Sequence, residues 1–396
     1  MDTGIVADVG EGAGAVAADG TRGDRGDAEG QGAAEGKGAA GRAEGFGMYP
    51  GSGHSKGDDY HKYGAVVGWD GTRFRGWQLQ GADPRFPERG APRTVQGAIE
   101  RAWSEALDPS RDPIERAVTV ASAGRTDVGV HAVAMPLHVW TPTRVDDLEA
   151  ATIALAGTLP RDVWVVRLER VPREFAANVG VERKTYRFQL WDGAEAPPER
   201  HLGRCWWVAD RRPKPPPGTP FVRGVDMRGP VPVVDVDAMR ACAARTLVQK
   251  REFSGLAAPN RGVSKVRRKL RREARERGED PGPKHDPHKE FVRTIFRCDV
   301  ERAEEHLVSI EVEGSGFLYK MVRLIASLLF DVGTGRRSLE DAERLVARAD
   351  SHATALELRP APSEGLCLRE VRYAEDHPGA SAMNPQPLTD DASLIY

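Results

Sequence analysis

The chain has 396 residues, 40% of them hydrophobic, and a formal net charge of −2 at pH 7. That length is enough for two domains with sizeable cores, whereas no apolar run reaches the ~20 residues of a transmembrane helix. We therefore expect no membrane anchor and no signal peptide. Since the four cysteines stand singly, we expect reduced thiols in an intracellular protein, in the cytoplasm or the nucleus, with an organelle left open.

The first 60 residues have a composition of their own. They are rich in Gly, Ala and acidic side chains, and they contain scarcely any β-branched or aromatic residue. Such a segment cannot bury enough apolar surface to offset the entropy lost on ordering. We predict a disordered N-terminal extension over residues 1–60. Because the extension is acidic, the rest of the chain is mildly basic even though the net charge of the whole chain is close to zero.

From residue 61 onward, short apolar runs alternate with amphipathic stretches. In the first half we predict a strand at 62–69, a helix capped by Thr94 and ended by Asp108-Pro109, strands at 118–122 and 136–140, a helix at 147–156 stopped by Gly157, and a strand at 163–168. In the second half we predict a strand at 184–191, a helix at 237–249, strands at 291–301 and 307–313, a helix at 317–332 closed by Gly333, a helix at 339–349 capped by Ser338, and a strand at 366–373. Two helices per half beside closely spaced strands favour an α+β fold over a parallel doubly wound sheet.

This pattern divides the body into an N-terminal half at 61–178, a C-terminal half at 179–375 and a flexible tail at 376–396. Two stretches in the C-terminal half have the composition of insertions, at about 210–229 and 260–290. The first is rich in Pro and Gly, which is typical of a surface loop. The second contains the basic run Lys265–Arg277, which is a charged helix or tail rather than part of the core, and such runs are solvated, act as localisation signals or bind phosphate groups.

The densest set of reactive side chains lies in Ala123–Ala132, with the sequence AGRTDVGVHA. Its glycines allow a tight turn and the close approach of a ligand, while Arg, Thr, Asp and His supply a cation, a hydroxyl, a nucleophile or base, and a titratable ring. Taken alone, a hairpin turn with a salt-bridged aspartate explains this string equally well.

The string GRTDVGVHA, however, resembles the catalytic-loop signature of the TruA family of tRNA pseudouridine synthases. Further segments resemble that family in the same order: WDG and GWQ within 69–78, TVQG at 94–97, LPRD at 159–162, RKTY at 183–186, FS at 253–254, GFLYKMVR at 316–323 and APSEGL at 361–366. The resemblance covers roughly residues 61–375. It implies the α+β pseudouridine-synthase fold, in which two ferredoxin-like halves join through a mainly antiparallel sheet with helices packed on it and a basic central cleft between them.

The resemblance also implies an activity, the isomerisation of uridine to pseudouridine in tRNA, in the anticodon stem-loop at about positions 38–40. Asp127 is implied as the nucleophile, Arg323 as its charged partner and Tyr186 as the residue that stacks on the base or takes its proton. The residues implied to bind substrate are Arg125, Thr126, His131 and Leu366. No cofactor is implied. A homodimer is implied, although the two insertions could block its interface.

Three alternatives remain open from the sequence. One is a non-catalytic RNA-binding or tRNA-chaperone protein with the same cleft, and another is a hydrolase built on Asp127 and His131. The third is a metal site at Asp127 and His131 or at His285 and His288. We expect no metal, because neither pair has a third ligand at a recognisable spacing.

Overall fold

The computed structural model describes residues 59–81, 92–107, 118–209, 233–259, 272, 291–348 and 357–385. All of them belong to one compact unit, which is distinct from residues 1–45. The expectations for the extension at 1–60 and for the insertions at 210–229 and 260–290 therefore lie almost wholly outside the described residues. The same holds for the basic run Lys265–Arg277 and for His285 and His288.

The described residues build one ten-stranded sheet with the order β4-β1-β3-β10-β5-β9-β8-β7, in which β2 also pairs with β3 and β6 with β5. Its strands are β1 (His61–Trp69), β2 (Thr119–Ser122), β3 (His131–Thr141), β4 (Val163–Arg170), β5 (Val181–Trp191), β6 (Trp206–Trp207), β7 (Lys250–Glu252), β8 (Val292–Glu304), β9 (Leu307–Gly314) and β10 (Leu366–Tyr373). Only the β3–β10 and β5–β6 pairs are parallel. The predicted α+β class with a mainly antiparallel sheet is confirmed.

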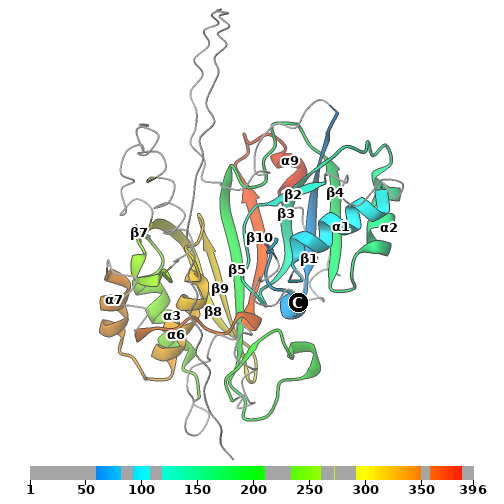
Figure 1. Ribbon diagram of the computed structural model, residues 1–396. Helices are drawn as coiled ribbons and strands as arrows, with labels where there is room; N and C mark the ends of the chain where they lie inside the picture. The colour runs from blue at the N-terminus through cyan, green and yellow to red at the C-terminus, as the bar shows by residue number, and fades with distance from the viewer. Residues whose placement is uncertain are drawn as a thin grey trace, which may run out of the picture. The chain divides into compact units, whose positions relative to one another are not determined.

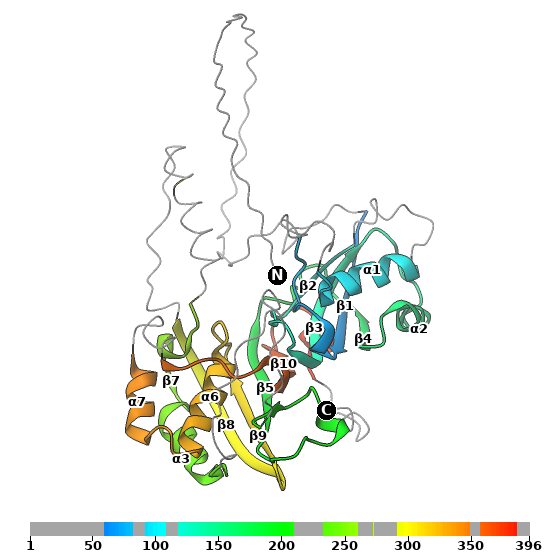
Figure 2. The same ribbon diagram turned by 60° about the horizontal axis from the view of Figure 1, so that its bottom comes forward.

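The longer helices form two groups. The helices are α1 (Val95–Leu107), α2 (Leu148–Thr158), α3 (Val236–Thr246), α6 (Met321–Gly333), α7 (Leu339–Ala347) and α9 (Ala380–Met383). Helices α1 and α2 lie on the side of β1–β4, whereas α3 packs on β8, α6 on β5, and α7 on α3 and α6 outside them (Figures 1 and 2). The short α9 packs on β1, β4 and β10. None of the helices in the described part of the chain is long and apolar enough to cross a membrane.

Two predicted helix caps are confirmed. The backbone N–H of Gly97 donates to the hydroxyl of Thr94 at 3.3 Å, and that of Asp341 donates to the hydroxyl of Ser338 at 3.1 Å. Each bond satisfies a donor at a helix N-terminus that has no partner within its own helix. Local sequence chemistry was therefore sufficient to locate these two starts.

Two predicted helix limits are wrong. Helix α2 passes through Gly157 and ends at Thr158, because an isolated glycine weakens a helix without ending it. Helix α6 begins at Met321 rather than Phe317, because Lys320 has φ 59°, a left-handed conformation that cannot continue into a right-handed helix. Residues 317–320 therefore form a non-helical approach to α6.

The expected flexible tail from residue 376 begins with an ordered segment instead. Ala380 and Met383 of α9 are buried, and the Asn384 side chain exchanges hydrogen bonds with the backbone of Tyr373 at 2.7 and 3.2 Å. This segment closes over the end of β10. Residues 386–396 lie outside the described part of the chain.

Candidate active site

The reactive side chains of the sequence lie in the loop that joins β2 to β3. These two strands pair antiparallel, so residues 123–130 form the connection between them. The loop folds back on itself, since the backbone N–H of Val130 donates to the carbonyl of Asp127 at 3.2 Å. Gly129 has φ +78°, a conformation that glycine adopts without steric cost. Asp127 thus occupies a sharp turn, with 28% of its side chain exposed.

Residues 69–77 form a cradle around this loop. The indole N–H of Trp69 donates to the carbonyl of Val130 at 2.9 Å. Gly76, with φ +89°, lies so close to the loop that a Cβ atom there would come within 2.7 Å of the carbonyl oxygen of Thr126. Residues 69–77 therefore support the loop by contacting its backbone carbonyl groups and not its reactive side chains.

Asp127 is in direct contact with Arg323, although 196 positions separate them in the chain. The Nη1 of Arg323 donates to the Oδ2 of Asp127 at 3.2 Å, and its Nε donates to the carbonyl of Ala361 at 2.6 Å. Burial lowers the pKa of Arg323 from its ordinary value, and the charge of Asp127 opposes that shift. The guanidinium is therefore fixed in orientation by two partners while it faces the carboxylate.

The burial of Arg323 is greater than the sequence pattern predicts. Helical spacing places it at the edge of the apolar stripe of α6, yet it is only 2% exposed, and its neighbours Val322 and Leu324 are equally buried. Because α6 starts at Met321, Arg323 lies in its first turn, where the helix meets the loop that carries Asp127. Its Nη2 is buried and makes no hydrogen bond with any described residue.

Tyr186 on β5 belongs to the same site. It is buried, and its ring meets the ring of Phe317 edge-on, with 5.3 Å between centroids. Burial raises the pKa of Tyr186 above its ordinary value, and the nearby charge of Asp127 raises it further. The phenol is therefore neutral near pH 7, beside the carboxylate of Asp127.

Two side chains just before α6, Tyr319 and Lys320, are also close enough to Asp127 for its charge to act on them. The pKa of Tyr319 is raised by burial and then by the charge of Asp127, while burial lowers the pKa of Lys320 against the pull of the same carboxylate. Among the described residues other than glycine, Lys320 alone has a positive φ. Sequence reasoning missed both residues, although they lie inside the GFLYKMVR string and could have been found there.

Two predicted substrate-binding residues sit in the loop itself. Arg125 is exposed, and Thr126 is partly buried with its hydroxyl lacking a hydrogen-bond partner among the described residues. Arg125 and Thr126 precede Asp127 by two residues and one residue. An exposed cation and an unsatisfied hydroxyl next to a carboxylate are groups that can bind a polar ligand.

The other two predicted substrate-binding residues begin strands. His131 opens β3 and is only 1% exposed, and its Nδ1 accepts a hydrogen bond from the backbone N–H of Gly71 at 3.0 Å. Leu366 opens β10, is 7% exposed and pairs with Phe188 of β5. The structure thus places His131 behind the loop, and its role as a substrate contact stays a prediction.

The cysteines and possible metal ligands do not add to this site. The cysteines are all buried and free: Cys205, Cys242, Cys298 and Cys367. Burial raises the pKa of Cys205 to about 12, which makes that thiol a poor nucleophile at neutral pH. Over the described ranges, no group of three or more His, Cys, Asp or Glu side chains could hold a metal ion.

Comparison with known proteins identifies similar chains. Residues 282–374 match a family model described as tRNA pseudouridine synthase. The chain is 30% identical over 323 residues to tRNA pseudouridine synthase A of Shouchella clausii, covering 80% of this chain and 97% of that protein. It is 31% identical to the protein of the same name from Lysinibacillus sphaericus, covering 78% and 98%, and 32% identical to that from Nitratidesulfovibrio vulgaris, again covering 78% and 98%.

Proposed function

This chain belongs to the tRNA pseudouridine synthase A family, a family of isomerases, and from that premise we propose that it converts uridine to pseudouridine in tRNA. In this isomerisation the bond between uracil N1 and ribose C1′ breaks and a bond between C5 and C1′ forms. C5 loses a proton and N1 gains one. Atoms and electrons balance within the substrate, so the proposal requires tRNA as a partner and no cofactor.

The observation that carries the proposal is the contact between Asp127 and Arg323 beside Tyr186. A carboxylate nucleophile must be ionised to attack, and a fixed guanidinium favours its charged form. We assign Asp127 the role of nucleophile toward the detaching nucleoside. Tyr186 provides a flat, buried face for the uracil ring, and its hydroxyl is a candidate for the proton of C5.

A uridine can reach this site only after it leaves the base stack of the RNA. Extrusion costs a few kcal/mol, which a side chain that fills the vacated space can offset. Arg125 is the exposed cation of the loop and is suited to that role. In the proposal Thr126, His131 and Leu366 surround the extruded base. The target uridines are those of the anticodon stem-loop, at about positions 38–40.

The proposal includes an architecture for substrate binding. Two ferredoxin-like halves, 61–178 and 179–375, would meet at a basic cleft that receives the tRNA, in a homodimer inside the cell. The relatives compared above come from bacteria, and they give no support to a nuclear location. The extension at 1–60 and the insertions at 210–229 and 260–290 would be additions to this catalytic body.

The test uses tRNA transcripts that carry tritium at C5 of uridine, since each isomerisation releases that label to water. We expect the purified protein to release tritium and Asp127→Asn to abolish release while tRNA affinity stays within a few-fold. The matched control is Asp146→Asn, which removes an exposed carboxylate that follows the end of β3 opposite the loop. Substantial release by Asp127→Asn would overturn the nucleophile assignment, and mapping the label by position tests the anticodon target.

The same assay separates the alternative of a non-catalytic RNA-binding protein. That alternative predicts tRNA binding by the unmodified protein without any tritium release at saturating enzyme. The presence of Asp127, Arg323 and Tyr186 in one site favours the enzyme, because binding alone has no need of a carboxylate facing a polyanion.

A further inference from the structure

Lys184 lies on β5 next to the proposed catalytic loop. Alternation along the strand places it on the same face as Tyr186, two residues away. Its Nζ donates to the carbonyl of Ala123, the first residue of the loop, at 2.7 Å. A Cβ atom at Gly124 would come within 3.0 Å of the same nitrogen, so the loop packs directly on the ammonium group.

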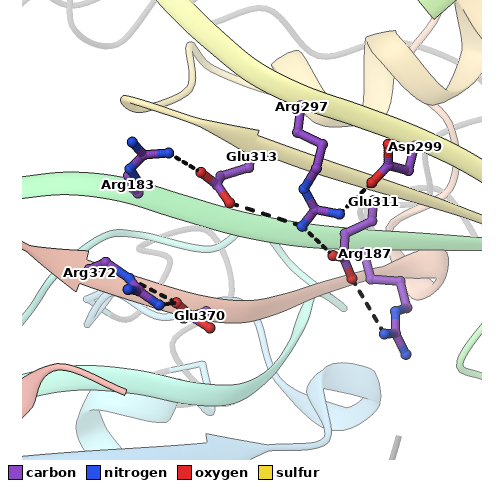
Figure 3. A network of polar contacts seen from close by, with 8 residues as sticks. All are labelled: Arg183, Arg187, Arg297, Asp299, Glu311, Glu313, Glu370 and Arg372. Atoms are coloured by element: carbon purple, nitrogen blue, oxygen red, sulfur yellow. Dashed lines mark hydrogen bonds and ion pairs between the residues drawn. The ribbon is translucent and has the colours of Figure 1, made fainter. Parts of the chain in front are cut away.

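Lys184 differs from the nearby cations of β5, because those form ion pairs with glutamates and Lys184 forms none with the described residues. On the opposite face of β5, Arg183 pairs with Glu313 at 2.5 Å and Arg187 with Glu311 at 3.4 Å (Figure 3). Lys184, between them in sequence, forms no ion pair with any described residue. A partly buried cation without a counter-charge is costly, and its free donors can take an anionic ligand.

The surroundings of Lys184 add positive rather than negative charge. Burial, and after it the charge of Arg293 on β8, lowers the pKa of Lys184 to about 8. The residues opposite it on the neighbouring strands are Gly314 of β9 and Val371 of β10, neither of which titrates. The two loop residues that contact its ammonium group, Ala123 and Gly124, do not titrate, and burial raises the pKa of Tyr186 on the same face of β5.

We propose that Lys184 is a phosphate-binding residue of the substrate site, which holds the RNA backbone beside the target nucleotide at the start of the catalytic loop. This inference rests on the proposed function. The phosphate supplies a counter-charge that no described residue provides, and the bond to Ala123 couples the bound backbone to the loop that carries Asp127. Lys184 acts through binding and positioning, not through the reacting atoms.

Lys62 provides a matched control within the same chain. Its Nζ also donates to a carbonyl, that of Arg173, at 2.7 Å, and burial also lowers its pKa to about 8. The carboxylate of Glu174, however, acts on it favourably. It stands near the start of β1, about 20 Å along the strand from the end that contacts the loop. Lys62→Met therefore removes a similar amine without touching the site.

The experiment measures tRNA affinity in a phosphate-free buffer as a function of salt and pH. Lys184→Met should lower affinity at least tenfold and reduce the slope of log affinity against log salt by about 0.7–0.9, the value for one phosphate contact. Lys62→Met should leave both unchanged. Lys184→Met also loses the hydrogen bond to the carbonyl of the buried Ala123, so a lower unfolding temperature is expected for either role. A purely structural lysine predicts that loss of stability with an unchanged salt slope, whereas a phosphate contact predicts a reduced slope.

The pH dependence gives a second readout. Binding to phosphate favours the charged amine, so the contribution of Lys184 is complete below pH 8 and falls by up to tenfold per pH unit above it. Lys184→Arg, which stays charged, should restore affinity and remove this step. An unchanged salt slope in Lys184→Met, or a pH step that persists in Lys184→Arg, overturns the proposal. Because the readout is binding, it stands apart from tritium release, whose absence would overturn the proposed function instead.

Discussion

Arg323 holds the carboxylate of Asp127 in one orientation through a hydrogen bond. Arg323 reaches both Asp127 and the carbonyl of Ala361 because its guanidinium is a planar fork with several donors. A lysine keeps the charge but presents it at a single nitrogen. The orientation of the carboxylate therefore depends on the shape of the cation as well as on its charge.

We expect Arg323→Lys to lower the single-turnover rate about 100-fold, because a displacement of about 1 Å at a reacting group has effects of that size. It should lower the free energy of unfolding by about 1.5–3 kcal/mol, the value of one hydrogen bond to a charged group. Chemical denaturation and tritium release measure the two effects. Arg144→Lys, in the exposed ion pair with Asp146, should change neither noticeably. A rate near that of the unmodified protein would contradict this role.

Tyr186 raises a narrower question, whether its hydroxyl or its ring matters. The ring packs on Phe317, and Tyr186→Phe keeps that contact, so tRNA affinity should stay within a few-fold. Since burial and the charge of Asp127 raise the pKa of Tyr186, the pH–rate profile should show no phenol ionisation up to about pH 10. The profile is best measured in Lys184→Arg, where the amine does not titrate. A tyrosine-like step below pH 10, or a large loss of affinity, would contradict this reading.

Some of these residues were within reach of sequence reasoning and others were not. The loop with Asp127, the tyrosine strand and Arg323 were predicted because they stand in strings that resemble a family. The contact of Lys184 with Ala123 was not predicted, because pairing across two distant segments leaves no local signal. The burial of Arg323 was missed for the same reason, since helical spacing does not show what packs against the helix.

At the scale of elements, residues 69–77 pack closely against the loop that carries Asp127. Gly76→Ala would place a Cβ within 2.7 Å of the carbonyl oxygen of Thr126, in a backbone conformation that alanine avoids. Because that atom belongs to the backbone, relief requires the loop itself to move. We therefore expect a loss of turnover of about 100-fold and a loss of stability of about 1–2 kcal/mol.

The control for this substitution is Gly157→Ala in α2, where a Cβ meets nothing within 4 Å. An exposed helical position gains about 0.5–1 kcal/mol from alanine, so this variant should be slightly more stable and fully active. Thermal unfolding and single-turnover rates of the two proteins decide the matter. Equal behaviour of the two variants would mean that the cradle does not shape the loop.

Some helix starts could be predicted from the local sequence, whereas the start of α6 depends on contacts with distant residues. Thr94 and Ser338 could be predicted as caps because their hydroxyls act on the next turn. The start of α6 could not, because nothing in the residue type of Lys320 indicates a left-handed backbone. Tertiary contacts around Asp127 and Arg323 surround that position, and they override a continuous helical pattern from Phe317 onward.

At the scale of the whole molecule, the two sequence halves share one sheet. The strands β1–β4 of the first half meet those of the second at β10, which pairs with β3 through Cys367 and Leu368 and with β5 along most of its length. We expect the body to unfold in a single cooperative transition, with equal calorimetric and van't Hoff enthalpies. Two resolved transitions would show instead that the halves are thermodynamically separate.

The central place of β10 also affects how the protein can be synthesised. β10 is the last strand of the described residues, yet it lies between β3 and β5, which emerge from the ribosome far earlier. Until Leu366 and the residues after it are made, the edge of β5 that β10 covers is unpaired from Val181 to Phe188, as is the short β3 edge at His131 and Ala132, and such edges are sites for misassociation. Nascent chains of this protein should therefore depend on chaperones until their final stretch, and premature termination should yield aggregates rather than a partly working enzyme.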